Sequence, residues 1–269
     1  MNHRPAVLAA LLLTLPRLSW RFIPVWRRNF FVWRKLAGPS ILGNLTDPLL
    51  YMLGLGYGLG ALLPEVNGIP YLAFLAGGTL AYSTMNSATF EATYSSFSRM
   101  HVQKTWEALL NAPLTIDDVL LGEWIWIATK SLFSGLAILL IIWVLGLYSN
   151  WALTLWLIPL VFLSGLTFGG LGLVMTSLSP SFDFFLYYFS LVVTPMMLLS
   201  GVFFPVTQLP EFLQVVSAIL PLAHVIDIVR PVLRGDIPAD WWQHGLILLA
   251  WATAAFWLAL TLTRKRLLS

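Results

Sequence analysis

Apolar residues run along the chain in long blocks that charges seldom interrupt. No charged residue occurs in the 52 positions between Lys130 and Asp183, and four further charge-free gaps cover 17 to 27 positions each. A membrane-spanning helix needs about 20 mostly apolar residues. The pattern therefore predicts six spanning helices, which we place at residues 41–63, 69–97, 120–146, 151–178, 181–204 and 242–263.

Composition supports a membrane protein of the all-α class. Of 269 residues, 58% are hydrophobic and 10% are charged, whereas soluble domains carry about 45–50% apolar and about 25% charged residues. Disordered chains, nucleic-acid binders and soluble enzymes are disfavoured together. The chain has no cysteine, so it offers neither a disulfide nor a thiolate ligand.

The segment before the first span divides into two parts. Residues 6–15 are apolar but too short to cross a bilayer; we expect a peripheral extension, with a processed or inserted segment as the alternative. Residues 17–35 then predict an amphipathic interfacial helix, with cations on one arc and aromatic side chains on another. The alternative is a basic flank of the first span. On the interfacial interpretation, the residues singled out on this helix are Trp26, Arg27, Arg28 and Trp33.

Two regions follow from this division: residues 1–37, a cytoplasmic segment with the interfacial helix, and residues 38–269, the six-helix domain. Lysine and arginine side chains favour cytoplasmic loops. Twelve of them fall in the N-terminal segment, the second-to-third loop and the C-terminal tail, against two in the loops of the other side. Both termini are therefore predicted to be cytoplasmic.

The second-to-third loop, residues 99–123, predicts two helices. A short one covers residues 104–111 and ends before Pro113, and Thr115 then caps a second one whose first turn holds two aspartates. We interpret the short helix as lying parallel to the membrane and presenting a surface to a partner. A polar loop without a partner is the alternative. The candidate contact residues are Lys104, Trp106, Glu107, Leu110 and Pro113.

On the outer side, residues 201–236 contain a short apolar segment bounded by prolines. Its helix, residues 211–220, is too short to span, and such segments are typically re-entrant or interfacial. We expect it to close the outer end of a pathway, with an ordinary amphipathic surface loop as the alternative. The candidate gate residues are Pro205, Pro210, Phe212 and Pro221.

Charges inside predicted spans are functional candidates because each costs a few kcal/mol to insert. Four meet this description: Asp47, Glu91, Glu123 and Lys130. Glu123 and Lys130 are seven positions apart on one helix face, and Glu91 lies near Arg99. Structural ion pairing and a direct role in transport or coupling both remain open for these side chains.

The sequence contains no local motif that is typical of a catalytic or metal site. The four histidines, His3, His101, His224 and His244, lie on separate segments, and no carboxylate cluster has metal-ligand spacing. We expect neither a catalytic residue nor a metal site. The glycine run at residues 54–60 lies inside an apolar span, which favours close helix packing over phosphate binding. The aromatic run at residues 182–189 either lines a path for a large amphiphile or faces lipid and a second copy.

This layout resembles the type 2 ABC exporter permeases, and more narrowly the NodJ subfamily, the permeases of nodulation lipo-oligosaccharide exporters. The resemblance extends from about Trp20 to the C-terminus. It rests on these segments: VWRRNFFVWRK, SILGNLTDPLLYMLGLGYGLG, RMHVQKTWEALLNAPLT, FPVTQLP and LPLAHVIDIVRP.

The resemblance implies a homodimer in the bacterial inner membrane that works with two copies of a separate, NodI-like ATPase. ATP and Mg²⁺ would be bound by that partner, and this chain would bind no cofactor. Residues 104–113 would be the coupling helix, residues 24–35 a gating helix and residues 204–221 the periplasmic closure. The cargo would be a lipo-oligosaccharide or related glycolipid.

Two other transport functions remain as alternatives. One is an ABC exporter of a drug or small hydrophobic molecule. The other is an ion-coupled secondary transporter that uses Glu91, Glu123 and Lys130 as a relay. A membrane enzyme is disfavoured by the missing catalytic motifs, and a nucleic-acid partner by the membrane domain.

Overall fold

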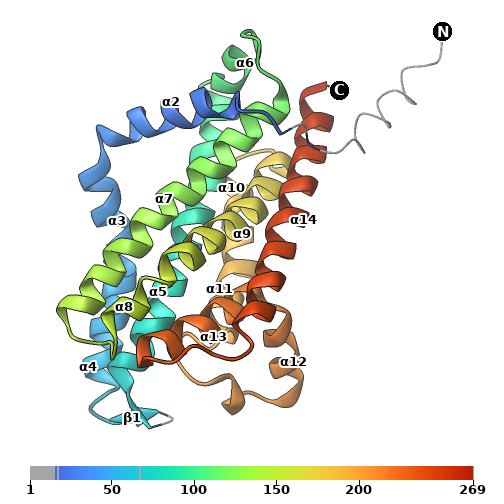
Figure 1. Cartoon of the computed structure of the whole chain (residues 1–269). Helices are drawn as coiled ribbons and strands as arrows, with labels where there is room; N and C mark the ends of the chain where they lie inside the picture. Colours follow the sequence, from blue (N-terminus) through green and yellow to red (C-terminus); the bar gives the residue numbers. More distant parts are fainter. Residues whose placement is uncertain (1–15, 17, 67, 269) are drawn as a thin grey trace.

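The computed structural model describes residues 16, 18–66 and 68–268, which form a bundle of helices (Figure 1). The expected peripheral extension at residues 6–15 lies outside these residues. Helices suit an apolar chain because each satisfies its backbone hydrogen bonds internally. The elements of the first half are α2 (Phe22–Arg34), α3 (Ala37–Leu49), η1 (Leu50–Leu55), α4 (Gly56–Gly58), β1 (Glu65–Val66), β2 (Ile69–Pro70), α5 (Tyr71–Phe90), η2 (Glu91–Ser95), η3 (Ser98–Val102), α6 (Thr105–Leu110) and α7 (Ile116–Val144).

The second half continues with helices, and the two short strands β1 and β2 pair antiparallel as a small hairpin. The segments η1 to η4 are π-helical turns, and η5 is a short 3₁₀ turn. The remaining elements are α8 (Trp151–Thr154), α9 (Leu157–Leu178), α10 (Asp183–Tyr188), η4 (Phe189–Val193), α11 (Thr194–Leu199), η5 (Val206–Gln208), α12 (Glu211–Ile219), α13 (Pro221–Arg234) and α14 (Trp241–Leu268).

Three helical tracts are long and apolar enough to cross a membrane: Ile116–Val144, Trp151–Leu178 and Trp241–Leu268. They coincide with the third, fourth and sixth predicted spans. The third begins at Ile116 rather than at residue 120, because Thr115 and Asp118 form a capping box that starts α7 there. The two helices expected between residues 104 and 146 are thus α6 and one continuous α7.

The other three predicted spans fall on helical tracts that contain π turns. These tracts are α3 to α4, α5 to η2, and α10 to α11. In the second, hydroxyl groups bond backbone carbonyls near the irregular turn: Thr93 donates to Thr89 at 2.7 Å and Ser96 to Glu91 at 3.1 Å. Side-chain donors of this kind satisfy carbonyls that an irregular turn releases. Membrane crossing by these three tracts stays a prediction.

Small residues let α9 pack closely inside the bundle, against α5, α7 and α14. A Cβ added at Gly165 would lie 2.9 Å from Ala128 Cα, and one at Gly172 would lie 2.5 Å from Ala92 Cβ. Close packing by small residues thus holds for this helix. In the glycine run of the first span it holds only in part, since Gly56 contacts Leu72 closely whereas Gly54 and Gly58 face open space.

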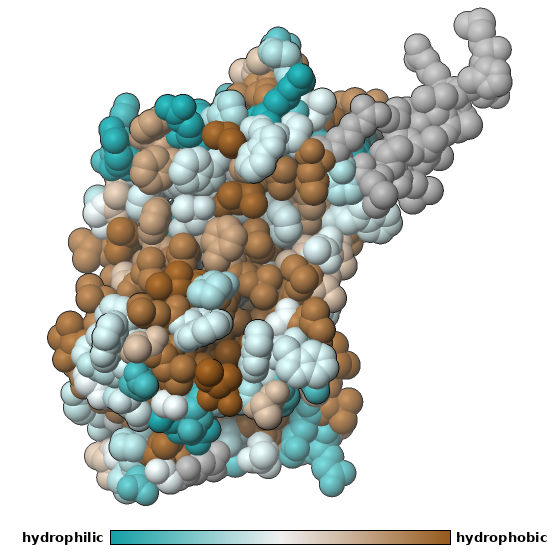
Figure 2. Space-filling view, viewed as in Figure 1, coloured by the Kyte–Doolittle hydropathy of each residue, from teal (hydrophilic) through white to brown (hydrophobic). Residues whose placement is uncertain are grey.

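The two ends of the bundle differ in composition from its middle. Figure 2 shows a broad apolar band between two more polar ends. At one end lie α2, α6 and the last turns of α14; at the other lie α4, α8, α12 and α13 (Figure 1). The helix α2 runs across the bundle, in keeping with the predicted interfacial helix.

The helices α12 and α13 form a pair bent by 87° at Leu220, as either a broken span or a re-entrant loop would be. The predicted short helix at residues 211–220 is therefore present. Its apolar side chains are exposed: Phe212, Val215, Val216 and Ile219.

Candidate functional site

Three of the four candidate intramembrane charges meet in one buried network beneath α2. Arg99 bridges the two acids, with Nη1 at 2.8 Å from Glu91 Oε1 and Nη2 at 2.6 Å from Glu123 Oε2. Lys130 Nζ lies 2.6 Å from Glu91 Oε2. The charges of the two carboxylates and the two cations cancel. Charges that are buried away from water need such partners. Asp47 is exposed on α3 and lies outside the network.

Neutral donors complete the network and connect it to separate elements. Glu123 accepts hydrogen bonds from Asn29 of α2 at 3.0 Å, from Trp106 of α6 at 3.2 Å and from Ser96 at 3.3 Å. Trp126 donates to Glu91 at 2.8 Å. One fully buried carboxylate on α7 therefore holds α2, α6 and the end of the second tract together.

The sequence positions explain this meeting. Glu123 and Lys130 project from one face of α7, as their spacing predicted. Glu91 begins η2 and Arg99 lies in η3, the irregular turns that follow α5. Asn29 and Trp126 were not anticipated. Asn29 interrupts the aromatic side of α2, and this single polar position was the signal available in the sequence.

A cavity of about 230 Å³ borders the network. Cationic and aromatic side chains from α2 and α7 share its wall with Glu91. Burial lowers the pKa of the Arg28 guanidinium, and nearby Arg99 lowers it further while Glu123 opposes the shift. The charged lining of the cavity comprises Arg28, Glu91, Arg99 and Lys130.

The helix α6 presents two different faces. Trp106 is 1% exposed and bonds to Glu123, so in this chain it points into the bundle rather than toward a partner. Glu107 is exposed and pairs with Lys104 at 2.7 Å. Lys104 begins the helix with a left-handed backbone, φ 54°. The outward surface thus consists of Lys104 and Glu107 with the exposed Pro113 beyond them, and Leu110 is half-buried.

The helix α2 is fastened to α7 by its aromatic side, the side that an interfacial helix turns toward lipid. Trp26 donates to Thr129 at 3.1 Å, and Trp33 stacks on Phe133 with ring centroids 5.0 Å apart. A Cβ at Gly122 would lie 2.6 Å from Val25 Cβ, which shows how closely the two helices approach. Much of the aromatic arc therefore packs on protein.

Comparison with known proteins was informative at the family level. A model of the ABC-2 type transporter family matches residues 19–233. The chain is 46% identical to Nodulation protein J of Rhizobium meliloti (strain 1021), over 94% of this chain and 97% of that protein. The chain belongs to the ABC-2 type transporter family. Within it, the chain falls in the Nodulation protein J subfamily of permeases.

Other relatives of this permease support the same grouping. Nodulation protein J of Rhizobium leguminosarum bv. viciae is 45% identical over 95% of this chain and 98% of its own length. The Inner membrane transport permease YadH of Escherichia coli (strain K12) is 25% identical over 80% of this chain and 84% of its own length. No solved structure matches. Membership in the family implies an ABC ATPase as a partner.

A second buried ion pair closes the same end of the permease. Arg264, near the end of α14, places Nη2 2.6 Å from Asp117 Oδ2 in the first turn of α7. Asp117 was interpreted as a helix-dipole residue alone, because its partner is 147 positions away in sequence. Arg266 donates to the carbonyls of Ser177 at 3.2 Å and Ser179 at 2.7 Å. The tail of α14 is thereby fixed to α7 and α9.

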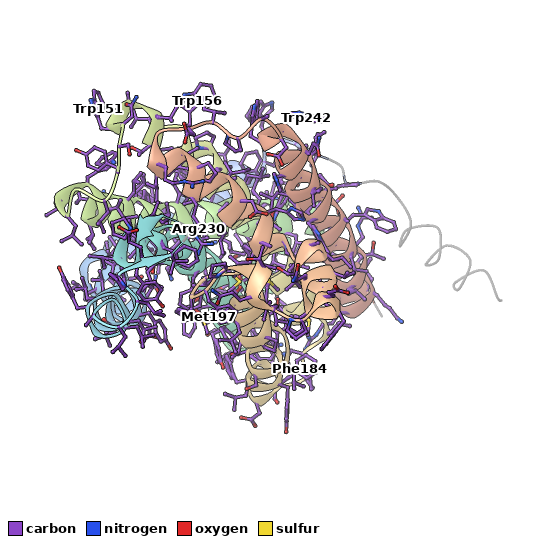
Figure 3. All side chains as sticks on the ribbon, turned by 90° about the horizontal axis from the view of Figure 1, so that it is seen from below. Trp151, Trp156, Phe184, Met197, Arg230 and Trp242 are labelled. Atoms are coloured by element: carbon purple, nitrogen blue, oxygen red, sulfur yellow. The ribbon has the colours of Figure 1, made fainter. Side chains whose placement is uncertain are left out.

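At the opposite end, backbone carbonyls hold the guanidinium of Arg230 on α13. Its guanidinium donates to the carbonyls of Gly201, of Val202 at 3.2 Å and of Phe74 at 3.3 Å, and it lies 3.6 Å from the Phe74 ring centroid. Figure 3 shows Arg230 in the interior of this end, with Trp151, Trp156 and Trp242 at its periphery.

The predicted gate residues are spread over this outer segment. Pro205 and Pro221 are buried, and Pro221 starts α13, where a missing N–H is harmless. Pro210 and Phe212 are exposed on α12 and its approach. Two of the four residues are therefore buried and two are exposed.

Proposed function

We propose that this permease is the membrane subunit of an ATP-driven exporter that moves an amphiphile outward across the inner membrane. The cargo class is a lipo-oligosaccharide or related glycolipid, by analogy with the relatives named Nodulation protein J. Two copies of the chain, each crossing the membrane six times with both termini in the cytoplasm, would work with two copies of a NodI-like ATPase. The partner would bind ATP and Mg²⁺.

The observation that carries the proposal is the position of Glu123. Its carboxylate joins α6, which has an exposed charged face for a partner, to the long apolar helix α7 and to α2. A push on α6 would therefore be transmitted through Trp106 to the helices that line a transport path. Nucleotide on the partner biases the two states because it interacts differently with each.

Exposed aromatic side chains support the membrane placement. Tryptophan concentrates at membrane–water interfaces. Four tryptophans at the outer end are at least half exposed: Trp151, Trp156, Trp241 and Trp242. The α10 to α11 tract also exposes Leu186, Tyr187 and Leu191, an apolar surface that suits lipid or the second copy.

Reconstitution with the ATPase tests the proposal. In vesicles loaded with a fluorescent lipo-oligosaccharide, Glu107→Ala should lower cargo moved per ATP hydrolysed by about tenfold, the equivalent of roughly 1.4 kcal/mol of coupling. Lys104→Ala is the comparison variant and should lower coupling less, because it also breaks the Lys104–Glu107 pair but leaves the acid available to the partner.

Three results would count against the proposal. Normal coupling in Glu107→Ala, or equal losses in both variants, would remove the coupling role of Glu107. Transport driven by a proton gradient without ATP would favour the ion-coupled alternative. Export of small hydrophobic drugs in place of the glycolipid would contradict the proposed cargo class but not the proposed exporter function.

A further inference from the structure

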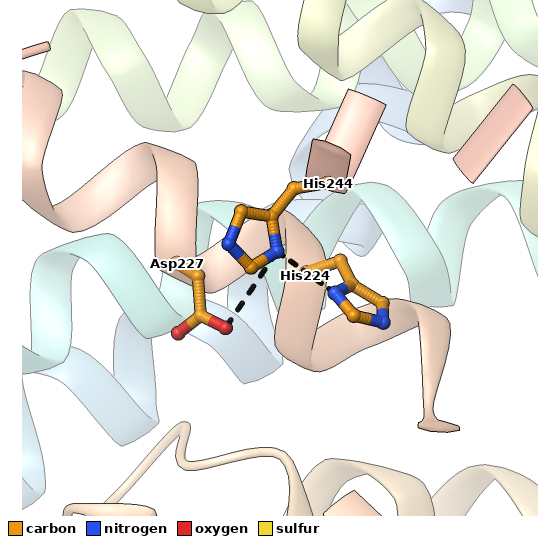
Figure 4. Close-up of side chains that lie close together, drawn as sticks. All are labelled: His224, Asp227 and His244. Carbon is orange, nitrogen blue, oxygen red and sulfur yellow. Dashed lines mark hydrogen bonds and ion pairs between the residues drawn. The ribbon is translucent and has the colours of Figure 1, made fainter. Parts of the chain in front are cut away.

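Three side chains from α13 and α14 meet at the outer end of the permease, away from the buried charge network. His224 Nδ1 and His244 Nδ1 are 2.8 Å apart, and Asp227 Oδ2 lies 4.0 Å from His244 Nδ1 (Figure 4). One potential ligand atom from each of the three residues falls within 4.8 Å of the others. We propose that these residues form a divalent-cation site of the zinc class that connects α13 to α14.

The helices explain why the ligands converge. His224 and Asp227 are three positions apart on α13, so they share one face. His244 lies in the first turns of α14, and the chain between them turns back at Gly235, φ 98°. The histidines were treated as scattered because this return of the chain cannot be read from their spacing. The expectation of no metal site overlooked this group.

The second ring nitrogen of His244 has its own partner. His244 Nε2 lies 3.3 Å from Asp240 Oδ2, one helical turn earlier. Metal-binding histidines commonly donate their other ring N–H to a carboxylate, which fixes the tautomer. A proton on Nε2 leaves a lone pair on Nδ1, directed at the Nδ1 of His224. With its proton on Nδ1, His224 donates to His244; with its proton on Nε2, the Nδ1 lone pairs of both rings are available as metal ligands.

The donor set selects the metal. Two imidazole nitrogens and one carboxylate oxygen are the ligands of open zinc sites, in which water fills the fourth position. Calcium and magnesium prefer oxygen ligands alone. Asp227 and Asp240 supply two negative charges beside two neutral rings, which matches a divalent cation. Arg230, three positions after Asp227, is directed away toward backbone carbonyls.

The geometry requires only side-chain adjustment. Tetrahedral coordination at about 2.0–2.1 Å separates two ligand nitrogens by roughly 3.3 Å, slightly more than the observed 2.8 Å. Asp227 must move closer by a rotamer change, and it is free to do so with a side chain that is 56% exposed. His224 is buried whereas both acids face solvent, so a metal enters from the surface.

Metal binding to the full-length chain provides the test. The permease is purified in detergent with a tag that lacks histidine, stripped with a chelator, and titrated with Zn²⁺ by calorimetry and with Co²⁺ by visible absorption. We expect one ion per chain and a tetrahedral Co²⁺ spectrum. His224→Ala and His244→Ala should each abolish both signals, and Asp240→Asn should weaken Zn²⁺ binding about 10- to 100-fold.

His101→Ala is the control variant, because this exposed histidine lies in η3, directly before α6 and far from α13 in the chain. It should bind as the wild type does. Gel filtration and circular dichroism identify any variant that fails to fold, and for such a variant His→Gln at the same position replaces it. Two results would contradict the metal site: no stoichiometric binding by the wild type, or His224→Ala and His244→Ala variants that bind metal as well as the wild type does. The two histidines would then form only a hydrogen bond.

Discussion

The two ends of this permease are held together by different kinds of interaction. At the α2 and α6 end, side chains from distant segments pair with one another, and Glu123 and Asp117 each receive a buried arginine. At the α12 and α13 end, Arg230 holds backbone carbonyls, and the apolar face of α12 is left exposed. A specific ion-pair network suits transmission of movement, whereas the other end depends on the backbone contacts of Arg230 and on the buried apolar face of α13.

The largest effect is expected at Glu123, which is fully buried. In Glu123→Leu, Arg99 retains only Glu91 as an acidic partner, and Trp106 and Asn29 lose their acceptor. Removing one member of a buried pair costs about 3–5 kcal/mol. We expect a strong fall in the thermal unfolding temperature in detergent and loss of ATPase stimulation by the permease.

Asp47→Leu is the matched control for this first variant. It also replaces an acid by leucine in a predicted span, but Asp47 is exposed on α3. Its unfolding temperature should stay near that of the wild type. Equal destabilisation by the two substitutions would show that the network adds nothing beyond the general effect of removing an acid.

A smaller and more local effect is expected at Arg230. Arg230→Met removes three hydrogen bonds to carbonyls of Phe74, Gly201 and Val202 while keeping an apolar stem. Hydrogen bonds that involve a charged group contribute about 1.5–3 kcal/mol each, but removing the buried guanidinium also ends its desolvation penalty, which offsets much of this loss. Hydrogen exchange should rise in residues 201–234 and stay unchanged in α6. Increased exchange at both ends would mean that the two ends are not independent.

Arg234→Met is the control here, since Arg234 lies on the same helix and is exposed. It should leave exchange in residues 201–234 close to the wild-type level. The pair of variants separates loss of the carbonyl contacts from loss of a positive charge on α13.

How far the sequence predicts these features depends on the range of each interaction. Charge-free runs located the long helices, and the Thr115 cap and the Lys104 helix follow from local patterns. The four charges were recognised as candidates, but their partners depend on how helices pack. Asp117 and Arg264 show the limit, because local capping explained the aspartate so well that no distant partner was sought.

Packing at α2 is similarly hidden from the sequence. Amphipathic periodicity identified the helix and its aromatic arc correctly. It could not distinguish lipid from protein as the surface that the arc contacts, since both are apolar. The deciding feature lies in another segment: Gly122 of α7, where the absence of a side chain lets Val25 approach.

The smallest effect is therefore expected at Gly122, and it tests whether α2 moves with the ion-pair end. In Gly122→Ala the new Cβ would lie 2.6 Å from Val25 Cβ and 2.9 Å from the Phe22 carbonyl oxygen. Overpacking of this kind costs about 1–3 kcal/mol. The better helix propensity of alanine offsets about 1 kcal/mol of this cost. Gly43→Ala is the control, with nothing within 4 Å of its Cβ. Quenching of tryptophan fluorescence should increase in Gly122→Ala alone, because lifting α2 exposes Trp26 and Trp33. Unchanged quenching together with reduced ATPase coupling would instead mean that the substitution acts through α7. In that case α2 would not belong to the coupling path.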